Sequence, residues 1–369
     1  MKKPNILFYC SWGGLGHIAR AASIISKLPM IATYTVATPE KWRFSKPSKN
    51  FKYIKLPTPK SRIRLRNEKL IIQNYTPGAN DIKGYQKHLH SFIDILKKIK
   101  PQIIVVDNPA EVAILTKIFG YKTAIVYESL ETNELRWKLA WKNVDKILAP
   151  YPKKFLEKAK FPYLKNTFCA GGFTRYDGIK SLSPRKAKKK IGLDVNKKYI
   201  LLTMGKGRKS ENIIKKVCQY TKEFGYEVLI AYPGKNKIIT NLAKSLPHLR
   251  HISGVYDEMN LYLSSADLII TGTGYGSVME ACYFRKPTIT IPLERIYNEQ
   301  TLKAKILSEM GAVISIKPSG LNQNNFKKAF EKLSDKRFLE KMEKSQQKVI
   351  DGKGAERAAK LLIGLSKNE

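Results

Sequence analysis

Acidic residues are scarce in this chain of 369 residues, which has 30 aspartates and glutamates against 68 lysines and arginines. The formal net charge of +38 should attract anionic surfaces and ligands over long distances. Nucleic acid is one such ligand, but the chain has no known nucleic-acid-binding motif and its basic residues are spread over both halves. We therefore expect an anionic partner other than a specific nucleic acid.

Long hydrophobic runs are also absent. None approaches the ~20 residues that a membrane-spanning helix needs, so any membrane association should be peripheral. The four cysteines have no pair spacing typical of a metal site and should be reduced core thiols. No D-x-D motif follows a predicted strand, and we expect neither a divalent metal nor a cofactor. Because Met1, Lys2 and Lys3 lead into a strand and not into a signal peptide, a cytoplasmic protein is expected.

The length of the chain exceeds that of one ordinary core and fits two α/β domains. Apolar strand patterns alternate with helical ones, which predicts parallel sheets with helices on both faces. We place a first domain at 1–165, a second at 166–345, and a C-terminal helix at 346–369 that packs back on the first. The predicted strands are 6–8, 34–38, 53–56, 103–106 and 123–127 in the first domain, and 199–203, 227–231, 251–253, 268–270 and 288–291 in the second.

In the second domain, one apolar strand is followed by a glycine turn and a helix. Gly272, Gly274 and Gly276 let the backbone turn tightly and approach a ligand. A helix that opens at Ser277 would point its free N–H groups and positive dipole end at that ligand, which suits a diphosphate. Glu280, one turn further on, could accept hydrogen bonds from the two hydroxyls of a ribose. The alternative is an ordinary strand-turn-helix with a solvated glutamate.

The first strand of the chain is followed by a second glycine loop, G-x-G-H-x-x-R, which contains Gly14, Gly16, His17 and Arg20. His17 should lie at a helix start, where the dipole is expected to lower its pKa and keep the imidazole neutral and able to accept a proton. A structural hydrogen-bonding role is the alternative for a lone histidine.

Two carboxylates follow strands of the first domain. Asp107 and Glu128 should both lie at the carboxyl edge of the sheet, where open α/β sheets bind their ligands. The sequence around Asp107 favours a helix N-cap before Pro109, because both residue types are common at helix starts. Glu128 has no such local explanation.

From 251 to 304 the chain resembles the donor half of the MurG-like glycosyltransferases, which add N-acetylglucosamine from a uridine diphosphate (UDP) sugar to a lipid-linked cell-wall precursor. The motifs ADLIITGTGYGSVMEA, KPTITIP and EQTLKA occur in that family's order. The resemblance implies the GT-B fold, in which two Rossmann-like domains with parallel sheets face a central cleft. It implies donor contacts from Tyr256 to the uracil, from Gly274, Tyr275, Gly276 and Ser277 to the diphosphate, from Glu280 to the ribose, and from Glu299 and Gln300 to the sugar.

The first domain resembles the same enzymes less closely. Its glycine loop, with Gly14 and Gly16, is similar to their amino-terminal loop, which makes His17 the first candidate for the catalytic base. A glutamate follows the equivalent strand in that family, so Glu128 is the second candidate. Arg20 stands where those enzymes usually have a proline.

Other basic residues are expected near the cleft. Arg175 lies in a segment that resembles the domain junction of these enzymes. Gly205 and Lys206 follow the strand 199–203. Lys206 or Arg208 could neutralise the donor diphosphate, but the excess of basic residues makes ordinary surface charge the default interpretation. The positions that depart from the family pattern in the second domain are Gly272, Tyr275 and Lys303. These departures leave the identity of the sugar open.

The resemblance implies an inverting, metal-independent transferase that moves a sugar, with N-acetylglucosamine as the first candidate, from a UDP-sugar to a cell-envelope precursor. The acceptor would be anionic and either lipid-linked or a polysaccharide. Basic residues interleaved with aromatic ones at 41–69 suit an anionic membrane surface, which predicts a peripheral location on the inner face of the cell membrane. For 60–80, a solvated loop is the alternative.

Three other functions fit parts of the sequence. The G-x-G-H-x-x-R loop also resembles UDP-sugar hydrolases of sialic-acid-like pathways, in which His17 would activate water. A nonhydrolysing sugar epimerase shares the architecture but should have further carboxylates around the sugar. A non-enzymatic protein that binds polyanions or membranes would be indifferent to uridine nucleotides.

Overall fold

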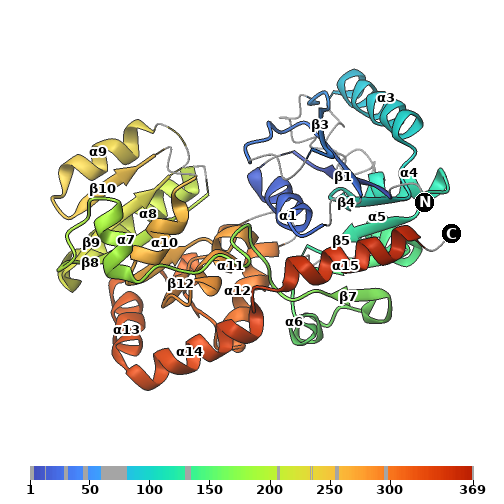
Figure 1. Cartoon of the computed structure of the whole chain (residues 1–369). Coiled ribbons are helices and arrows are strands. Elements are labelled where there is room, and N and C mark those ends of the chain that lie inside the picture. Colours follow the sequence, from blue (N-terminus) through green and yellow to red (C-terminus); the bar gives the residue numbers. More distant parts are fainter. Residues whose placement is uncertain are drawn as a thin grey trace.

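Two parallel sheets organise the chain. The computed structural model describes residues 4–12, 14–28, 32–44, 49–59, 81–128, 134–205, 208–232, 234, 236–253, 257–294 and 298–367. Within these residues, a sheet of seven strands and a sheet of six form two lobes that lie side by side (Figure 1). Every described pair of neighbouring strands is parallel, which confirms the predicted α/β class.

The first sheet has the strand order β3-β2-β1-β4-β5-β6-β7. Its strands are β1 (Asn5–Cys10), β2 (Thr33–Thr38), β3 (Phe51–Lys55), β4 (Ile103–Asp107), β5 (Thr123–Val126), β6 (Lys146–Ala149) and β7 (Thr167–Cys169). The helices of this part of the chain are α1 (Leu15–Ile25), α3 (Ile82–Ile99), α4 (Ala110–Ile118), α5 (Leu135–Asn143) and α6 (Lys153–Lys158). Because β7 pairs with β6, the sheet extends beyond residue 165, where the sequence placed the end of the first domain.

The central strands β1 and β4 are almost wholly buried, as expected for apolar runs covered by helices on both faces. Their register pairs Cys10 with Asp107, and the N–H of Ser11 donates to the carbonyl of Asp107 at 3.1 Å. The glycine loop after β1 therefore starts beside the last residue of β4. This pairing brings α1 and Asp107 to the same edge of the sheet.

The second sheet has the strand order β10-β9-β8-β11-β12-β13. Its strands are β8 (Lys198–Thr203), β9 (Tyr226–Ala231), β10 (Leu249–Ile252), β11 (Leu268–Thr271), β12 (Thr288–Thr290) and β13 (Ile314–Ser315). The helices of this part are α7 (Pro184–Lys190), α8 (Arg208–Tyr220), α9 (Lys237–Ser245), α10 (Met259–Ser265), α11 (Tyr275–Tyr283) and α12 (Glu299–Glu309).

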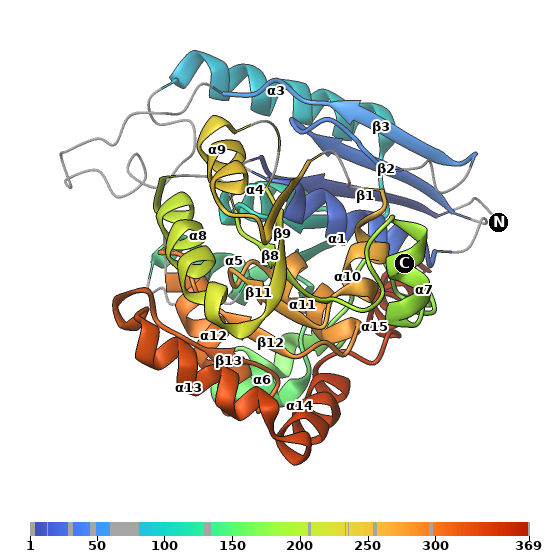
Figure 2. The same ribbon diagram turned by 90° about the vertical axis from the view of Figure 1, so that its left-hand side faces the viewer.

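Three helices end the chain: α13 (Gln323–Ser334), α14 (Lys336–Val349) and α15 (Gly354–Lys367). Phe330 of α13 stacks on Phe224 with ring centres 4.1 Å apart, so α13 belongs to the core of the second sheet. Figure 2 shows α14 at the opposite end of the molecule from α3. In contrast, α15 packs against α1, β1 and β4 of the first sheet. No helix of the described residues is both long and apolar enough to cross a bilayer.

Candidate active site

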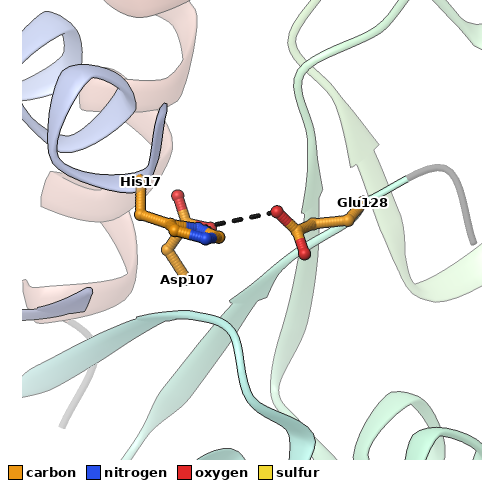
Figure 3. Close-up of side chains that lie close together, drawn as sticks. All are labelled: His17, Asp107 and Glu128. Carbon is orange, nitrogen blue, oxygen red and sulfur yellow. Dashed lines mark hydrogen bonds and ion pairs between the residues drawn. The ribbon is translucent and has the colours of Figure 1, made fainter. Parts of the chain in front are cut away.

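A cluster of four charged or titratable side chains lies at the carboxyl edge of the first sheet. His17 and Arg20 come from the first turns of α1, Asp107 ends β4, and Glu128 follows β5. His17 Nδ1 lies 2.8 Å from Asp107 Oδ1 and 3.5 Å from Glu128 Oε1. Figure 3 shows these three side chains pointing toward one another. The structure thus brings both predicted candidates for the base, His17 and Glu128, into one site.

Arg20 holds this cluster together. Its Nη2 donates to Asp107 Oδ1 and to Glu128 Oε1, both at 2.6 Å, and its Nε donates to Asp107 Oδ2 at 2.8 Å. The ring nitrogen and the two carboxylate oxygens lie within 4.8 Å of one another, a spacing at which a cation fits. The guanidinium of Arg20 supplies positive charge beside these atoms.

The pKa of His17 differs from the expectation. Burial lowers it, but the carboxylates of Asp107 and Glu128 outweigh burial and raise the pKa above its ordinary value of 6.5. For Asp107, burial would raise the pKa, but Arg20 and His17 hold it well below its usual range. The prediction of a lowered pKa for His17 is therefore wrong, because the two adjacent carboxylates favour the protonated ring.

This shift predicts the pH dependence of the reaction. A base must be unprotonated, and the pKa of His17 is raised, so activity is lost as the pH falls through a value above 6.5. We expect the acidic limb of the kcat/KM profile, measured over about pH 5 to 9, to lie above the ordinary histidine value and to disappear in His17→Gln. An acidic limb below the ordinary value would contradict this arrangement.

Asp107 and Arg20 are the site residues that the sequence did not assign. The N-cap of α4 is Pro109, and no side chain caps that helix, so the N-cap role predicted for Asp107 is wrong. Asp107 is 3% exposed and turns toward Arg20 instead. The available signal was that Asp107 directly follows a predicted strand, at the sheet edge where the glycine loop G-x-G-H-x-x-R with its arginine also lies.

The glycine turn of the second domain lies near this cluster, because α11 packs on α1. The helix α11 begins at Tyr275, two residues before the predicted start at Ser277, with Gly274 as its N-cap and no side chain capping its N–H groups. Ser277 donates back to the Gly274 carbonyl at 3.3 Å. A Cβ on Gly276 would meet no atom within 4 Å, and the same holds for Gly14 and Gly16 at the start of α1. The backbone at both helix starts is therefore accessible to a ligand.

Side chains of α12 hold this glycine turn. Gln300 Oε1 accepts from the N–H of Thr273 at 3.2 Å and from that of Leu293 at 3.0 Å. Lys303 is 1% exposed, and its Nζ donates to the Thr273 carbonyl at 3.1 Å and lies 3.6 Å from Glu299 Oε2. Gln300 and Lys303 thus hold the N–H and the carbonyl of Thr273, the residue before Gly274.

Glu280 lies on α11 and faces Arg175 of the domain junction, whose Nε donates to Glu280 Oε1 at 3.2 Å. Burial raises the pKa of Glu280, and Arg175 opposes that shift. Tyr275 turns its side chain away from the glycine turn and toward the first domain. Its hydroxyl donates to the Phe173 carbonyl at 3.0 Å, and the guanidinium carbon of Arg20 lies 5.2 Å from the centre of its ring.

Of the remaining predicted donor contacts, Gly205 lies two residues after the end of β8 and is exposed. Lys206 and Tyr256 lie outside the described residues. The other predicted site residues gather around the start of α1, the start of α11 and the first turn of α12. These elements meet through α1 and α11, which pack on each other.

Comparison with known proteins gives a consistent result. Residues 179–362 match the Glycosyltransferase family 28 C-terminal domain. The chain is 30% identical over 292 residues to a UDP-N-acetylglucosamine--N-acetylmuramyl-(pentapeptide) pyrophosphoryl-undecaprenol N-acetylglucosamine transferase of Caldicellulosiruptor saccharolyticus, covering 76% of each chain.

Solved structures agree on the fold. A glycosyltransferase of kitacinnamycin superposes with a TM-score of 0.70 at 14% identity, covering 99% of this chain and 100% of that one. MurG of Acinetobacter baumannii superposes with a TM-score of 0.62 at 14% identity, covering 98% and 99%. These likenesses confirm the GT-B fold. With the sequence identity above, they show that the chain is a glycosyltransferase and belongs to the MurG-like glycosyltransferases of family 28.

Proposed function

We propose that the protein transfers a sugar, with N-acetylglucosamine as the first candidate, from a UDP-sugar to a lipid-linked cell-envelope precursor, with inversion and without a metal. The observation that carries this proposal is the contact between the His17 cluster and the glycine turn of the second domain. The His17 cluster of α1 lies against the uncapped start of α11, with Arg20 beneath the ring of Tyr275. This contact is the arrangement expected if a base and a diphosphate-binding turn serve one reaction.

The donor half suits a nucleoside diphosphate. The uncapped N–H groups at the start of α11 and the positive end of its dipole favour an anion. Glu280, one turn into α11, is placed to accept hydrogen bonds from a ribose, as in the family pattern. The named activity of the Caldicellulosiruptor saccharolyticus relative supports UDP-N-acetylglucosamine as donor and a pyrophosphoryl-undecaprenol acceptor.

The reaction that fits this geometry is a single displacement. His17 Nε2 takes the proton of the acceptor hydroxyl, whose oxygen forms a bond to the anomeric carbon as the bond from that carbon to the diphosphate breaks. The diphosphate leaves with the bonding electrons and is stabilised by the N–H groups of α11. Attack from the face opposite the leaving group inverts the anomeric centre. The proposed step uses the N–H groups of α11, and no metal, to stabilise the leaving diphosphate.

Membrane contact is part of the proposal, and the predicted surface at 41–69 lies only partly within the described residues. In the described part of 41–69, the ring of Trp42 packs on Phe44 and Phe51, with centres 5.2 and 4.7 Å away, and these aromatics serve the core. The exposed large apolar side chains of the described residues are concentrated at the neighbouring helices α4 and α5. They are Ile118 and Phe119 at the end of α4, and Leu135 and Leu139 on α5; only Ile179 and Ile238 lie elsewhere.

On α5, the exposed face alternates apolar and basic residues. Leu135, Lys138, Leu139 and Lys142 follow the i, i+3, i+4, i+7 spacing of one helix face, and all four are exposed. Such a face can bury its leucines in a lipid interface while its lysines reach anionic headgroups. An acceptor held in the membrane would then reach the first domain.

This face gives a prediction. The double variant Leu135→Gln/Leu139→Gln should bind vesicles containing anionic lipid about tenfold more weakly, because it removes two apolar side chains from the contact. Flotation with phosphatidylglycerol vesicles measures this, and UDP affinity should not change. A matched variant, Ile179→Gln/Ile238→Gln, should bind vesicles normally. Equal binding by both double variants would exclude α5 as the contact.

The proposed function is tested with a calorimetric panel of nucleoside diphosphates and nucleotide sugars at two salt concentrations. Salt-tolerant preference for UDP over its adenosine and guanosine counterparts is the expected result, with turnover unchanged by a chelator. Binding without nucleotide preference that disappears with salt would refute the proposal, since a chain of this charge attracts any phosphate.

A further inference from the structure

Arg20 lies at the centre of the His17 cluster but behind its accessible face. Its side chain is 7% exposed and that of Asp107 4%, against 16% for His17 and 14% for Glu128. An acceptor hydroxyl can therefore reach His17 or Glu128 more readily than the guanidinium. Any effect of Arg20 on the reaction must pass through the side chains that it holds.

The contacts of Arg20 fix which ring nitrogen of His17 is available. The two donors from Arg20 to Asp107 form a fork that orients this carboxylate, and the ionised carboxylate only accepts hydrogen bonds. His17 Nδ1 lies 2.8 Å from Asp107 Oδ1 and 3.0 Å from Arg20 Nη2, but the two hydrogens of Nη2 already point to Asp107 Oδ1 and Glu128 Oε1 at 2.6 Å. The proton of the neutral ring therefore belongs on Nδ1, facing Asp107. Nε2 then keeps its lone pair for the acceptor. Arg20 also holds Glu128, the other carboxylate near Nδ1, at 2.6 Å.

Tyr275 connects this arrangement to the donor half. It is the first residue of α11 and 8% exposed, and its hydroxyl both donates to the Phe173 carbonyl at 3.0 Å and accepts from the Phe173 N–H at 3.1 Å. Its ring lies over the Arg20 guanidinium at 5.2 Å and meets Tyr151 edge-on with centres 5.5 Å apart. The side chain of this first residue of α11 is therefore held on three sides, by Phe173, Arg20 and Tyr151.

We propose that Arg20 is a positioning residue that presents Nε2 of His17 to the acceptor, and that Tyr275 couples Arg20 to the diphosphate-binding turn of α11. This inference rests on the proposed function, because it gives the ligand at that turn as a nucleoside diphosphate. A diphosphate seated on the N–H groups of α11 fixes the ring of Tyr275 and the guanidinium beneath it. Through Asp107, the same contact fixes the imidazole.

The charged groups around the base come from several elements. Asp107 and Glu128 of the first sheet face His17 directly, and Arg20 faces it from the next turn of α1. From the second domain, Lys303 on α12 interacts with Arg20 and Glu128. Loss of Arg20 therefore leaves two carboxylates beside His17 with one fewer cation, which favours the protonated ring.

Kinetics of matched variants test the role of Arg20. Arg20→Gln should lower kcat about 10²-fold, the cost of misplacing a reacting group, and change the UDP dissociation constant less than about threefold. It should also move the acidic limb of the pH profile upward. Arg20→Lys keeps the charge without the fork and should recover part of kcat. Arg337→Gln, an exposed arginine of α14, is the control. Parallel losses of kcat and UDP affinity in Arg20→Gln would overturn the positioning role.

A double-mutant cycle tests the coupling. Tyr275→Leu removes the aromatic ring and should lower kcat about tenfold in the native background. In the Arg20→Gln background the same substitution should lower kcat little further, because Tyr275 and Arg20 act through the same contact. Tyr275→Phe keeps the ring and loses only the hydroxyl, so it should retain more activity than Tyr275→Leu. Effects that multiply in Tyr275→Leu/Arg20→Gln would overturn the coupling.

Nitrogen NMR of histidine-labelled protein separates this inference from the proposed function. The chain has only five histidines, which makes assignment of His17 practicable. The free protein should show His17 with its proton on Nδ1, and Arg20→Gln should lose this single state. UDP should shift the His17 signals in the native protein and in Tyr275→Phe, but much less in Tyr275→Leu. If UDP does not bind, the proposed function fails, while the comparison of free native protein with Arg20→Gln still decides the positioning role.

Discussion

Replacement of His17 by glutamine is expected to lower turnover by about 10²- to 10⁴-fold, the range that a general base contributes, while UDP binds normally. Glutamine keeps a polar side chain of similar reach but has no nitrogen that accepts a proton near neutral pH. In the structure, Nδ1 of His17 faces Asp107 at 2.8 Å, which leaves Nε2 for the acceptor hydroxyl. Single-turnover kinetics with calorimetry of UDP separates the loss of chemistry from any loss of binding.

A matched control comes from the same domain. His90 is exposed on α3, and His90→Gln should leave both turnover and UDP binding unchanged. If His17→Gln turned over at the native rate, the base would have to be another group. Glu128, 3.5 Å from His17 Nδ1, would then be the next residue to replace, and the mechanism proposed above would be wrong.

Glu280→Ala is expected to weaken UDP binding by about 1 to 3 kcal/mol, which corresponds to roughly five- to 150-fold, through the loss of a charged hydrogen bond. The carboxylate lies one turn into α11 and is 17% exposed, with Arg175 Nε as a partner at 3.2 Å. Arg175 opposes the rise in the pKa of Glu280 that burial causes, and so favours the charged acceptor. A ribose hydroxyl would add to this pair as a second donor.

Comparison of UDP with 2′-deoxy-UDP tests this assignment specifically. The native protein should prefer UDP, and Glu280→Ala should bind both nucleotides with nearly equal affinity, because the acceptor that distinguishes them is gone. Glu331→Ala, on the exposed face of α13, is the control and should keep the preference. A Glu280→Ala variant that still prefers UDP would show that the ribose is recognised elsewhere.

The second sheet and its ligand-binding turn could be predicted well from the sequence. An apolar strand, a glycine turn and a helix follow one another within 268–283, so local pattern alone fixes their order. Each strand predicted from such a pattern corresponds to an observed strand. The strands β6, β7 and β13 were not predicted, because they are only two to four residues long and lie at or near sheet edges.

The cluster around Arg20 could not be predicted, because its contacts span long distances along the chain. Asp107 lies 87 residues from Arg20, and Glu128 lies 108 residues away. The local sequence around Asp107 is typical of a helix N-cap. The ion pair between Asp107 and the buried guanidinium of Arg20 is a tertiary interaction, which a local sequence pattern does not predict. The direction of the pKa shift of His17 was wrong for the same reason, since both carboxylates that cause it are distant in sequence.

The direction of side chains was a further feature that the sequence did not predict. Tyr275 was assigned to the donor because it lies in the glycine turn, and its backbone does start α11. The side chains of the first turn of a helix point in several directions, however. The side chain of Tyr275 reaches Phe173 and Arg20. The aromatic residues Trp42 and Phe44 were similarly placed on a membrane surface, while the structure packs them against the first core.

The most direct measurement uses UDP-N-acetylglucosamine labelled in the sugar, incubated with and without pyrophosphoryl-undecaprenol-linked N-acetylmuramyl pentapeptide. We expect label to move into the lipid fraction only when acceptor is present, and His17→Gln to abolish this movement. Release of the label as free sugar at the same rate with and without acceptor would contradict this expectation, because His17 would then be activating water.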